Sequence, residues 1–177
     1  MTVVTKSNAQ RHGMVLWDQV CHEVLADYPE LDTDWMLVDA MAAKMVTTPG
    51  KYDTILATNL HADILSDLAS ALTGSLGNGA TANLNPPGDA PSMFEPIHGS
   101  AFDITGRGIS NPIGAFWTAT MMLDHLGETA ASALLMEAIG SVCQSGPYTP
   151  DMGGQANTAA VTHAVIEAIT EIVRRKT

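Results

Sequence analysis

The sequence predicts an α/β protein in which helices flank a layered sheet. Two observations favour this class. Short runs of β-branched and other apolar residues alternate with longer segments whose apolar residues recur at helical spacing. Hydrophobic residues make up 46% of the 177 residues and charged residues 15%, so the chain has enough apolar material for a core, as in an ordinary soluble globular protein.

Three short apolar runs predict strands in the first part of the chain. They are residues 3–5, which read as the end of a strand, residues 35–38, and residues 53–58, where the strand pattern is clearest. The first strand should lie centrally in a sheet, yet no segment precedes it to cover its faces. We therefore expect the sequence to begin partway through a domain.

A helix is predicted after each of these strands. Residues 13–25 carry apolar side chains at helical spacing. Residues 40–46 form a second helix, which ends before Pro49. Asn59 caps a third helix, whose apolar stripe ends before Gly74.

The second part of the chain begins with turns and continues with helices. Residues 74–91 are rich in Gly, Asn and Pro and are expected to form mostly turns. Apolar periodicity then predicts helices at residues 112–126, 130–142 and 158–174.

Charge and hydropathy limit the partners that this chain could have. A formal net charge of −11 at pH 7 repels phosphate backbones and anionic lipids, so neither nucleic acid nor a membrane surface is expected as a partner. The sequence has no apolar run of about 18 residues and no basic leader, which predicts a cytoplasmic protein. Cys21 and Cys143 show no redox or metal-binding spacing and are expected to be reduced.

Three carboxylates are candidates for a metal site. Asp63 and Asp67 are spaced i, i+4 on a predicted helix and project from one face, whereas Asp39 directly follows an apolar run. Without nearby Cys or paired His, such a set suits Mg²⁺ or Mn²⁺ better than zinc. A solvated helix face is the alternative interpretation of Asp63 and Asp67.

Two loops could carry further chemistry. Lys6 lies just beyond the first strand, two residues from Asn8, where α/β proteins often place functional groups, although a surface lysine is the alternative. Residues 98–101 precede a glycine-rich turn at residues 106–108. Such a loop can bring backbone N–H groups close to a nucleotide, but it matches no standard phosphate-binding motif.

Five segments, in this order and at these spacings, carry a resemblance to a known family. They are Thr5-Lys6-Ser7-Asn8, Val38-Asp39-Ala40-Met41, residues 58–67, residues 94–101 and Asn111-Pro112. They resemble the metal-dependent β-decarboxylating dehydrogenases, which include isopropylmalate, isocitrate, tartrate and D-malate dehydrogenases. The residues of these segments are most similar to those of the tartrate and D-malate dehydrogenases, and the resemblance extends to residues 149–154.

The resemblance implies a shared active site in a homodimer. Asp63 and Asp67 of one subunit and Asp39 of the other would hold Mn²⁺ or Mg²⁺ together with a 2-hydroxy diacid such as tartrate or D-malate. Lys6 would take the proton of the C2 hydroxyl, and Asp39 would belong to the catalytic set with it. The metal would assist hydride loss and decarboxylation. A monovalent cation is a further implied activator.

The resemblance also implies NAD as the cofactor. A carboxylate at position 103 accepts hydrogen bonds from both ribose hydroxyls and repels the additional phosphate of NADP. The residues that would bind the cofactor are Asn8, Glu95, His98, Gly99, Ser100, Ala101, Asp103, Ile104 and Asn111.

By the same resemblance, this chain is the carboxy-terminal half of an isocitrate/isopropylmalate dehydrogenase-like fold. Residues 1–73 would form part of the smaller, dimer-forming domain, and residues 74–177 part of the larger, cofactor-binding domain. The preceding half would supply the arginines that bind the substrate carboxylates and a proton-donating tyrosine. Three alternatives stay open: a non-catalytic or regulatory partner chain, an inactive fragment, and 3-isopropylmalate as substrate.

Overall fold

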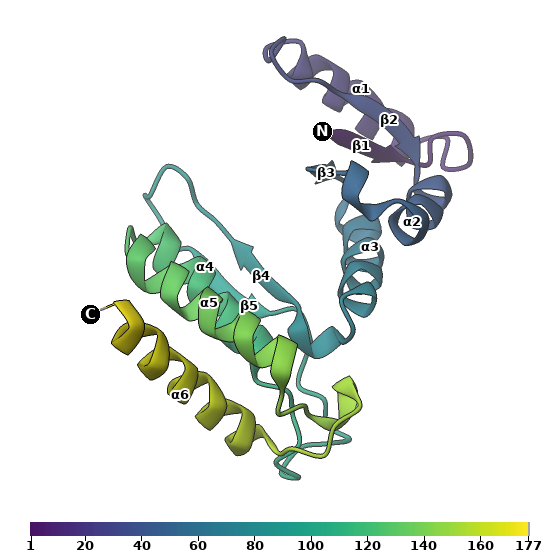
Figure 1. The fold of residues 1–177 in the computed structure, drawn as a ribbon. Helices are drawn as coiled ribbons and strands as arrows, with labels where there is room; N and C mark the ends of the chain where they lie inside the picture. Colours follow the sequence, from purple (N-terminus) through teal and green to yellow (C-terminus); the bar gives the residue numbers. More distant parts are fainter. Residues whose placement is uncertain (177) are drawn as a thin grey trace. The chain divides into compact units, whose positions relative to one another are not determined.

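The computed structural model describes residues 1–176 (Figure 1). The chain divides into two compact units, Met1–Leu72 and Thr73–Thr177, and each has its own buried apolar core. Both units combine strands with helices, so the predicted α/β class is confirmed. Within residues 1–176, no helix has the length and apolar character needed to span a bilayer.

A parallel three-stranded sheet organises the first unit. The strands β1 (Thr2–Thr5), β2 (Asp34–Leu37) and β3 (Ile55–Leu56) lie in the order β2-β1-β3. Both neighbours run parallel to β1. The carboxyl ends of all three strands therefore lie at one edge of the sheet, which is where open α/β sheets commonly bind ligands.

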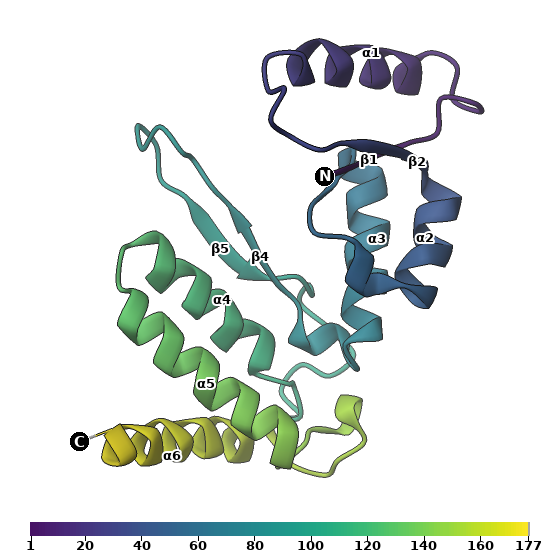
Figure 2. The same cartoon turned by 45° about the horizontal axis from the view of Figure 1, so that its top comes forward.

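Helices cover both faces of this sheet. Figure 2 shows α1 (Gly13–Leu25) on one face and α2 (Val38–Thr47) and α3 (Asn59–Leu72) on the other. Val4 packs with buried residues of α2 and α3, and strand alternation directs Val3 to the opposite face. Both valines are fully buried, so β1 forms the centre of the unit.

The second unit consists of a β-hairpin and three helices that pack on one another in chain order. The antiparallel strands β4 (Ala80–Asn83) and β5 (Met93–Pro96) form the hairpin, and α4 (Ile113–His125) packs against it. Next, α5 (Thr129–Ser145) packs on α4, and α6 (Thr158–Lys176) packs on α5 (Figures 1 and 2). The core between the helices contains Ile113, Ala138, Ile139, Val142, Val161, Val165 and Ile172.

The boundaries of two predicted strands are wrong. The strand predicted at residues 53–58 contains only Ile55 and Leu56. The reason is that β3 is an edge strand whose single neighbour is β1, and it pairs with only two residues of β1. The strand predicted at residues 35–38 ends at Leu37, and Val38 begins α2. Asp39 consequently lies in the first turn of a helix, where the helix dipole favours a negative charge.

The prediction of mostly turns for residues 74–91 is also incomplete. This stretch contains a 3-10 turn at Leu76–Asn78 and the strand β4, whose partner β5 was likewise not predicted. Three of the four residues in β4 are Ala or Asn, which have low strand propensity. The hairpin therefore depends on cross-strand pairing and on packing against α4.

Candidate functional site

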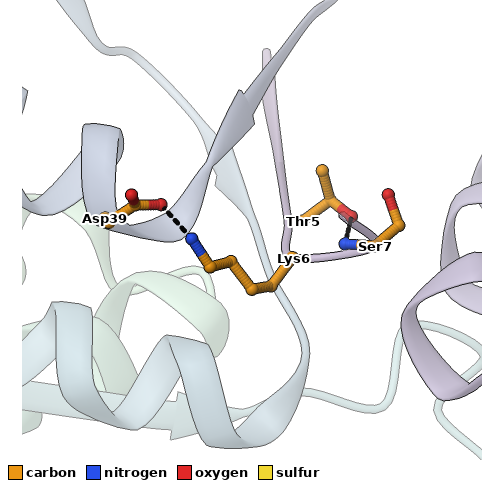
Figure 3. Close-up of polar contacts among 4 residues, drawn as sticks. All are labelled: Thr5, Lys6, Ser7 and Asp39. Atoms are coloured by element: carbon orange, nitrogen blue, oxygen red, sulfur yellow. Dashed lines mark hydrogen bonds and ion pairs between the residues drawn. The ribbon is translucent and has the colours of Figure 1, made fainter. Parts of the chain in front are cut away.

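Lys6 and Asp39 meet at the carboxyl ends of two neighbouring strands. Lys6 follows the last residue of β1, and Asp39 is the second residue of α2. The parallel register sets Thr5 opposite Leu37, so both side chains leave the sheet at the same edge. Lys6 Nζ donates a hydrogen bond to Asp39 Oδ1 at 2.6 Å (Figure 3). The backbone N–H of Ser7 donates to Thr5 Oγ1 and orders the turn that carries Lys6.

This ion pair changes the chemistry of Asp39 more than it changes stability. The hydrogen bond from Lys6, followed by that of the Asp39 backbone N–H, holds the pKa of Asp39 below its ordinary value. The Asp39 side chain is 67% exposed and that of Lys6 25%, so water screens the pair and its contribution to the free energy of unfolding is small. Asp39 is thereby kept ionised, as a metal ligand must be.

Replacing Lys6 by Met should raise the pKa of Asp39 towards its ordinary value. With Lys6 present, the lowered pKa stabilises the folded chain above the ordinary carboxyl pKa, and this stabilisation is lost as the pH falls through the lowered value. A carboxyl-carbon NMR titration of Asp39 in the wild type and in Lys6→Met measures the difference. Lys44→Met, which removes another lysine of the same unit, is the control. Identical Asp39 titrations in wild type and Lys6→Met would show that Lys6 does not lower the pKa of Asp39.

Asp63 and Asp67 lie one turn apart on α3, which begins at the same sheet edge. Both residues are exposed, and neither forms an ion pair with any residue in the described part of the chain. Like charges at i, i+4 destabilise a helix slightly unless a cation lies between them. Their oxygen chemistry fits Mg²⁺ or Mn²⁺, but residues 1–176 contain no group of three or more His, Cys, Asp or Glu placed to hold a metal ion.

His61 is a residue of this region that the sequence analysis did not single out. It lies in the first turn of α3, two residues before Asp63, and is only 5% exposed. Its Nδ1 has no hydrogen-bond partner within residues 1–176. A sequence signal was available, because His61 shares the i, i+4, i+7 stripe with Leu65 and Leu68, both of which pack in the core.

A cavity in the second unit brings together much of the predicted cofactor-binding loop. Its volume is about 450 Å³, within the usual range for small-molecule sites. Five of its lining residues were predicted from the sequence: His98, Gly99, Ser100, Ala101 and Ile104. The remaining lining residues are Thr105, Gly106, Gly108, Ser110 and Thr158.

Hydrogen bonds within the loop shape this cavity. The Thr105 hydroxyl donates to the carbonyl oxygen of Ala101 at 3.3 Å, and His98 Nδ1 lies 3.1 Å from the carbonyl oxygen of Gly99. Ala101 has a φ of 44°, a left-handed conformation that is uncommon for residues other than glycine. Strained backbone of this kind clusters at ligand-binding segments, which favours a binding role for the loop.

Four predicted cofactor residues do not line this cavity. Asp103 and Glu95 are exposed, Asp103 in the loop and Glu95 on β5. Asn8 is exposed in the first unit. Asn111 is only 5% exposed, at the end of the loop. Their contacts with a cofactor stay predictions.

The predicted site residues are divided between the two units. The first carries the catalytic and metal candidates together with Asn8, and the second carries the remaining cofactor candidates. A hydride transfer needs the nicotinamide and the metal-bound substrate at one place. The structure describes each of these two sets of residues within its own unit.

Comparisons with known proteins point to the same family as the five sequence segments. The chain matches the isocitrate/isopropylmalate dehydrogenase family over residues 1–169. It is 63% identical over 169 residues to a probable tartrate dehydrogenase/decarboxylase of Agrobacterium vitis, covering 96% of this chain and 47% of that protein. It is 42% identical over 174 residues to the decarboxylating D-malate dehydrogenase of Escherichia coli, covering 96% and 48%. The chain thus spans about half the length of these curated relatives.

A solved structure supports the same assignment at the level of the fold. The isocitrate dehydrogenase of Methylococcus capsulatus superposes with a TM-score of 0.88 at 37% identity, over 95% of this chain and 50% of that one. The resemblance drawn from the five segments is confirmed. Because the family match covers nearly all of its residues, the chain belongs to the isocitrate/isopropylmalate dehydrogenase family.

Proposed function

We propose that this chain forms part of an NAD- and divalent-metal-dependent enzyme that oxidises and decarboxylates a 2-hydroxy diacid such as tartrate or D-malate. The observation that carries the proposal is the contact between Lys6 and Asp39 at the carboxyl edge of a parallel sheet, where α3 with Asp63 and Asp67 also begins. The names of the relatives, a tartrate dehydrogenase/decarboxylase and a D-malate dehydrogenase, support the substrate class.

Each residue of the first unit has a distinct part in this proposal. In its neutral amine form, Lys6 would accept the proton of the C2 hydroxyl at Nζ as hydride leaves C2. Asp39 orients the Lys6 side chain through their hydrogen bond and supplies a carboxylate oxygen to the metal. Asp63 and Asp67 supply the other oxygens. Held by these carboxylates, a divalent metal would supply Lewis-acid chemistry for the oxidation and decarboxylation.

We also propose that two copies of the chain share each site. Residues 1–176 of a single copy contain no group of three His, Cys, Asp or Glu placed to hold a metal ion, and the resemblance to the family implies a site shared between two subunits. In the proposed homodimer, Asp39 and Lys6 of one subunit meet Asp63 and Asp67 of its partner. The first unit would supply the dimer contacts, and the second would be part of the larger cofactor-binding domain. A monovalent cation is an additional candidate activator.

Asp103 should make the enzyme prefer NAD to NADP. An ionised carboxylate accepts hydrogen bonds from the ribose hydroxyls and repels a 2′-phosphate. We expect calorimetric titration of the chain to give a lower Kd for NAD than for NADP, and Asp103→Asn to narrow the difference. Asp89→Asn is the control, since that aspartate lies in the loop between β4 and β5. Equal affinity for the two cofactors in the wild type would count against this role of Asp103.

A chimera tests the proposed reaction. The half of the Agrobacterium vitis relative that this chain does not span is fused to it, and NADH formation is followed with tartrate, D-malate and 3-isopropylmalate. We expect Mn²⁺-dependent NAD reduction that Lys6→Ala abolishes. A folded chimera that is inactive with every one of the three acids would contradict the proposal. Turnover that does not depend on Lys6 would contradict it as well.

A further inference from the structure

A carboxylate outside the predicted site joins three distant segments of the second unit. Asp151 lies in the 3-10 turn Pro150–Met152. Its Oδ2 accepts hydrogen bonds from the hydroxyl of Ser75 and from Nδ2 of Asn111, the latter at 2.9 Å. Ser75 Oγ in turn accepts the backbone N–H of Gly77 at 2.9 Å. Ser75 is 7% exposed and Asn111 5%, so this network is largely shielded from water.

The side chain of Asn111 also belongs to this network, and its amide nitrogen and oxygen both form hydrogen bonds. Asn111 Nδ2 also donates to Asn78 Oδ1 at 3.0 Å, and Asn111 Oδ1 accepts the backbone N–H of Ile113 at 3.0 Å. Both amide hydrogens are therefore used within the protein. The Asn111 side chain fixes the start of α4 and has no hydrogen left to donate to a cofactor, so any contact it makes with a nucleotide through N–H must come from its backbone.

The network holds both ends of the loop at residues 98–110. At the end of the loop, Asn111 is bonded to Asp151 and Asn78. At its start, the backbone N–H of Ile97 donates to the carbonyl oxygen of Gly79 at 3.0 Å, next to the same segment. The loop is thus attached at each end to residues 75–79, which Asp151 fastens through Ser75.

Close packing shows that this arrangement has little room to adjust. A Cβ atom on Gly77 would lie 2.8 Å from Cβ of Asn111, and one on Gly114 would lie 2.7 Å from the carbonyl oxygen of Gly77. Only glycine allows these backbones to approach so closely. The electrostatics agree, because partial burial acts to raise the pKa of Asp151, yet hydrogen bonds, with that of Ser75 foremost, outweigh it and hold this pKa below its ordinary value.

We propose that Asp151 is a positioning residue for nucleotide binding: through Asn111 and Ser75 it sets the spacing between the two ends of the loop at residues 98–110 and so the shape of the 450 Å³ cavity that the loop lines. The ligand class is the ADP-ribose part of a dinucleotide. This inference rests on the proposed function, because it takes the loop to be the nucleotide site. Asp151 itself does not line the cavity and acts only through the loop.

Binding of ADP-ribose and NAD to variants of the full 177-residue chain tests the inference. Asp151→Ala removes the acceptor of both hydrogen bonds and should raise the Kd of each ligand about tenfold, which corresponds to about 1.4 kcal/mol. Asp151→Asn keeps an oxygen where Oδ2 lies but loses the charge, so its Kd should fall between those of wild type and Asp151→Ala. Asp124→Ala and Asp124→Asn are the controls, because Asp124 is exposed on α4 and its side chain makes no hydrogen bond within residues 1–176.

Amide hydrogen exchange separates positioning from general destabilisation. In Asp151→Ala, we expect faster exchange at residues 98–113 and unchanged exchange in α5 and α6. Faster exchange throughout the second unit would overturn the inference in favour of a purely structural role. A wild-type Kd retained by Asp151→Ala would overturn it and leave the nucleotide site intact. If wild type binds neither ADP-ribose nor NAD, the proposed cofactor site fails, and the inference falls with it.

Discussion

The purified 177-residue chain should reduce NAD with tartrate or D-malate about 10⁴-fold more slowly than the chimera that restores the other half of the protein. The reason is the substrate's charge. A 2-hydroxy diacid carries two carboxylates, and effective orientation of such a dianion depends on bidentate contacts from arginine. The 177 residues contain only eight Lys and Arg, so few cations are present to make these contacts.

Only one of the four arginines of the sequence, Arg11, belongs to the unit that carries Lys6 and the three aspartates. Arg174 and Arg175 lie in the last turn of α6, and Arg175 pairs with Glu171 at 3.2 Å. Arg107 belongs to the loop of the second unit. Only Arg11 lies close in sequence to Lys6, and a single contact cannot orient both carboxylates.

The comparison needs matched assays with Mn²⁺, NAD and each acid, read by the absorbance of NADH. Lys6→Ala in the chimera measures the background without the proposed base. Robust turnover by the 177-residue chain alone, abolished by Lys6→Ala, would show that the chain supplies a complete catalytic site and that this interpretation is wrong. An inactive chain beside an active chimera is the expected result.

Substituting both Asp63 and Asp67 by Asn should weaken Mn²⁺ binding at least about 100-fold, because even the loss of groups that only support metal ligands costs 10–100-fold. These two carboxylates lie on one face of α3, are exposed and have no ion-pair partner within residues 1–176. Calorimetry or the paramagnetic resonance signal of free Mn²⁺ measures the affinity.

Thermal unfolding provides a second, independent test of Mn²⁺ binding by Asp63 and Asp67. Without metal, the double variant should be slightly more stable than wild type, because the i, i+4 repulsion is removed. With Mn²⁺, wild type should gain stability through binding and the variant should not. The control for Mn²⁺ affinity is Glu167→Gln combined with Glu171→Gln, which changes another i, i+4 pair of exposed carboxylates, on α6, in which Glu171 also pairs with Arg175. Equal Mn²⁺ affinity in the two double variants would exclude Asp63 and Asp67 as the metal ligands.

Local features of the chain were accurately predictable. The helix α1 begins and ends at the residues expected from its apolar spacing, and α3 extends from Asn59, which was predicted as its cap, to Leu72. Helix boundaries of this kind depend on side chains a few positions apart, so they can be predicted from the local sequence. The family was likewise predictable, because its motifs are read in order along the chain.

Pairing between distant segments was not predictable in the same way. The length of β3 depends on how much of β1 it can pair with, and the β4–β5 hairpin joins strands across a long turn-rich connection. His61 and Asp151 were missed for a related reason. Their surroundings, a buried helix face and a hydrogen-bond network spanning residues 75, 111 and 151, are assembled only when the chain folds.

The sequence by itself determined which chemical groups this protein has: the lysine after the first strand, the three aspartates and the glycine-rich loop. The tertiary structure decided which of them meet. Lys6 and Asp39 are 33 residues apart and form a 2.6 Å contact because the parallel register of β1 and β2 ends both strands at one edge. At the end of the loop, Asn111 is hydrogen-bonded to Asp151 and Asn78, which are distant from it in the sequence. Such contacts follow from backbone pairing and burial over the whole unit, which no local pattern of residues specifies.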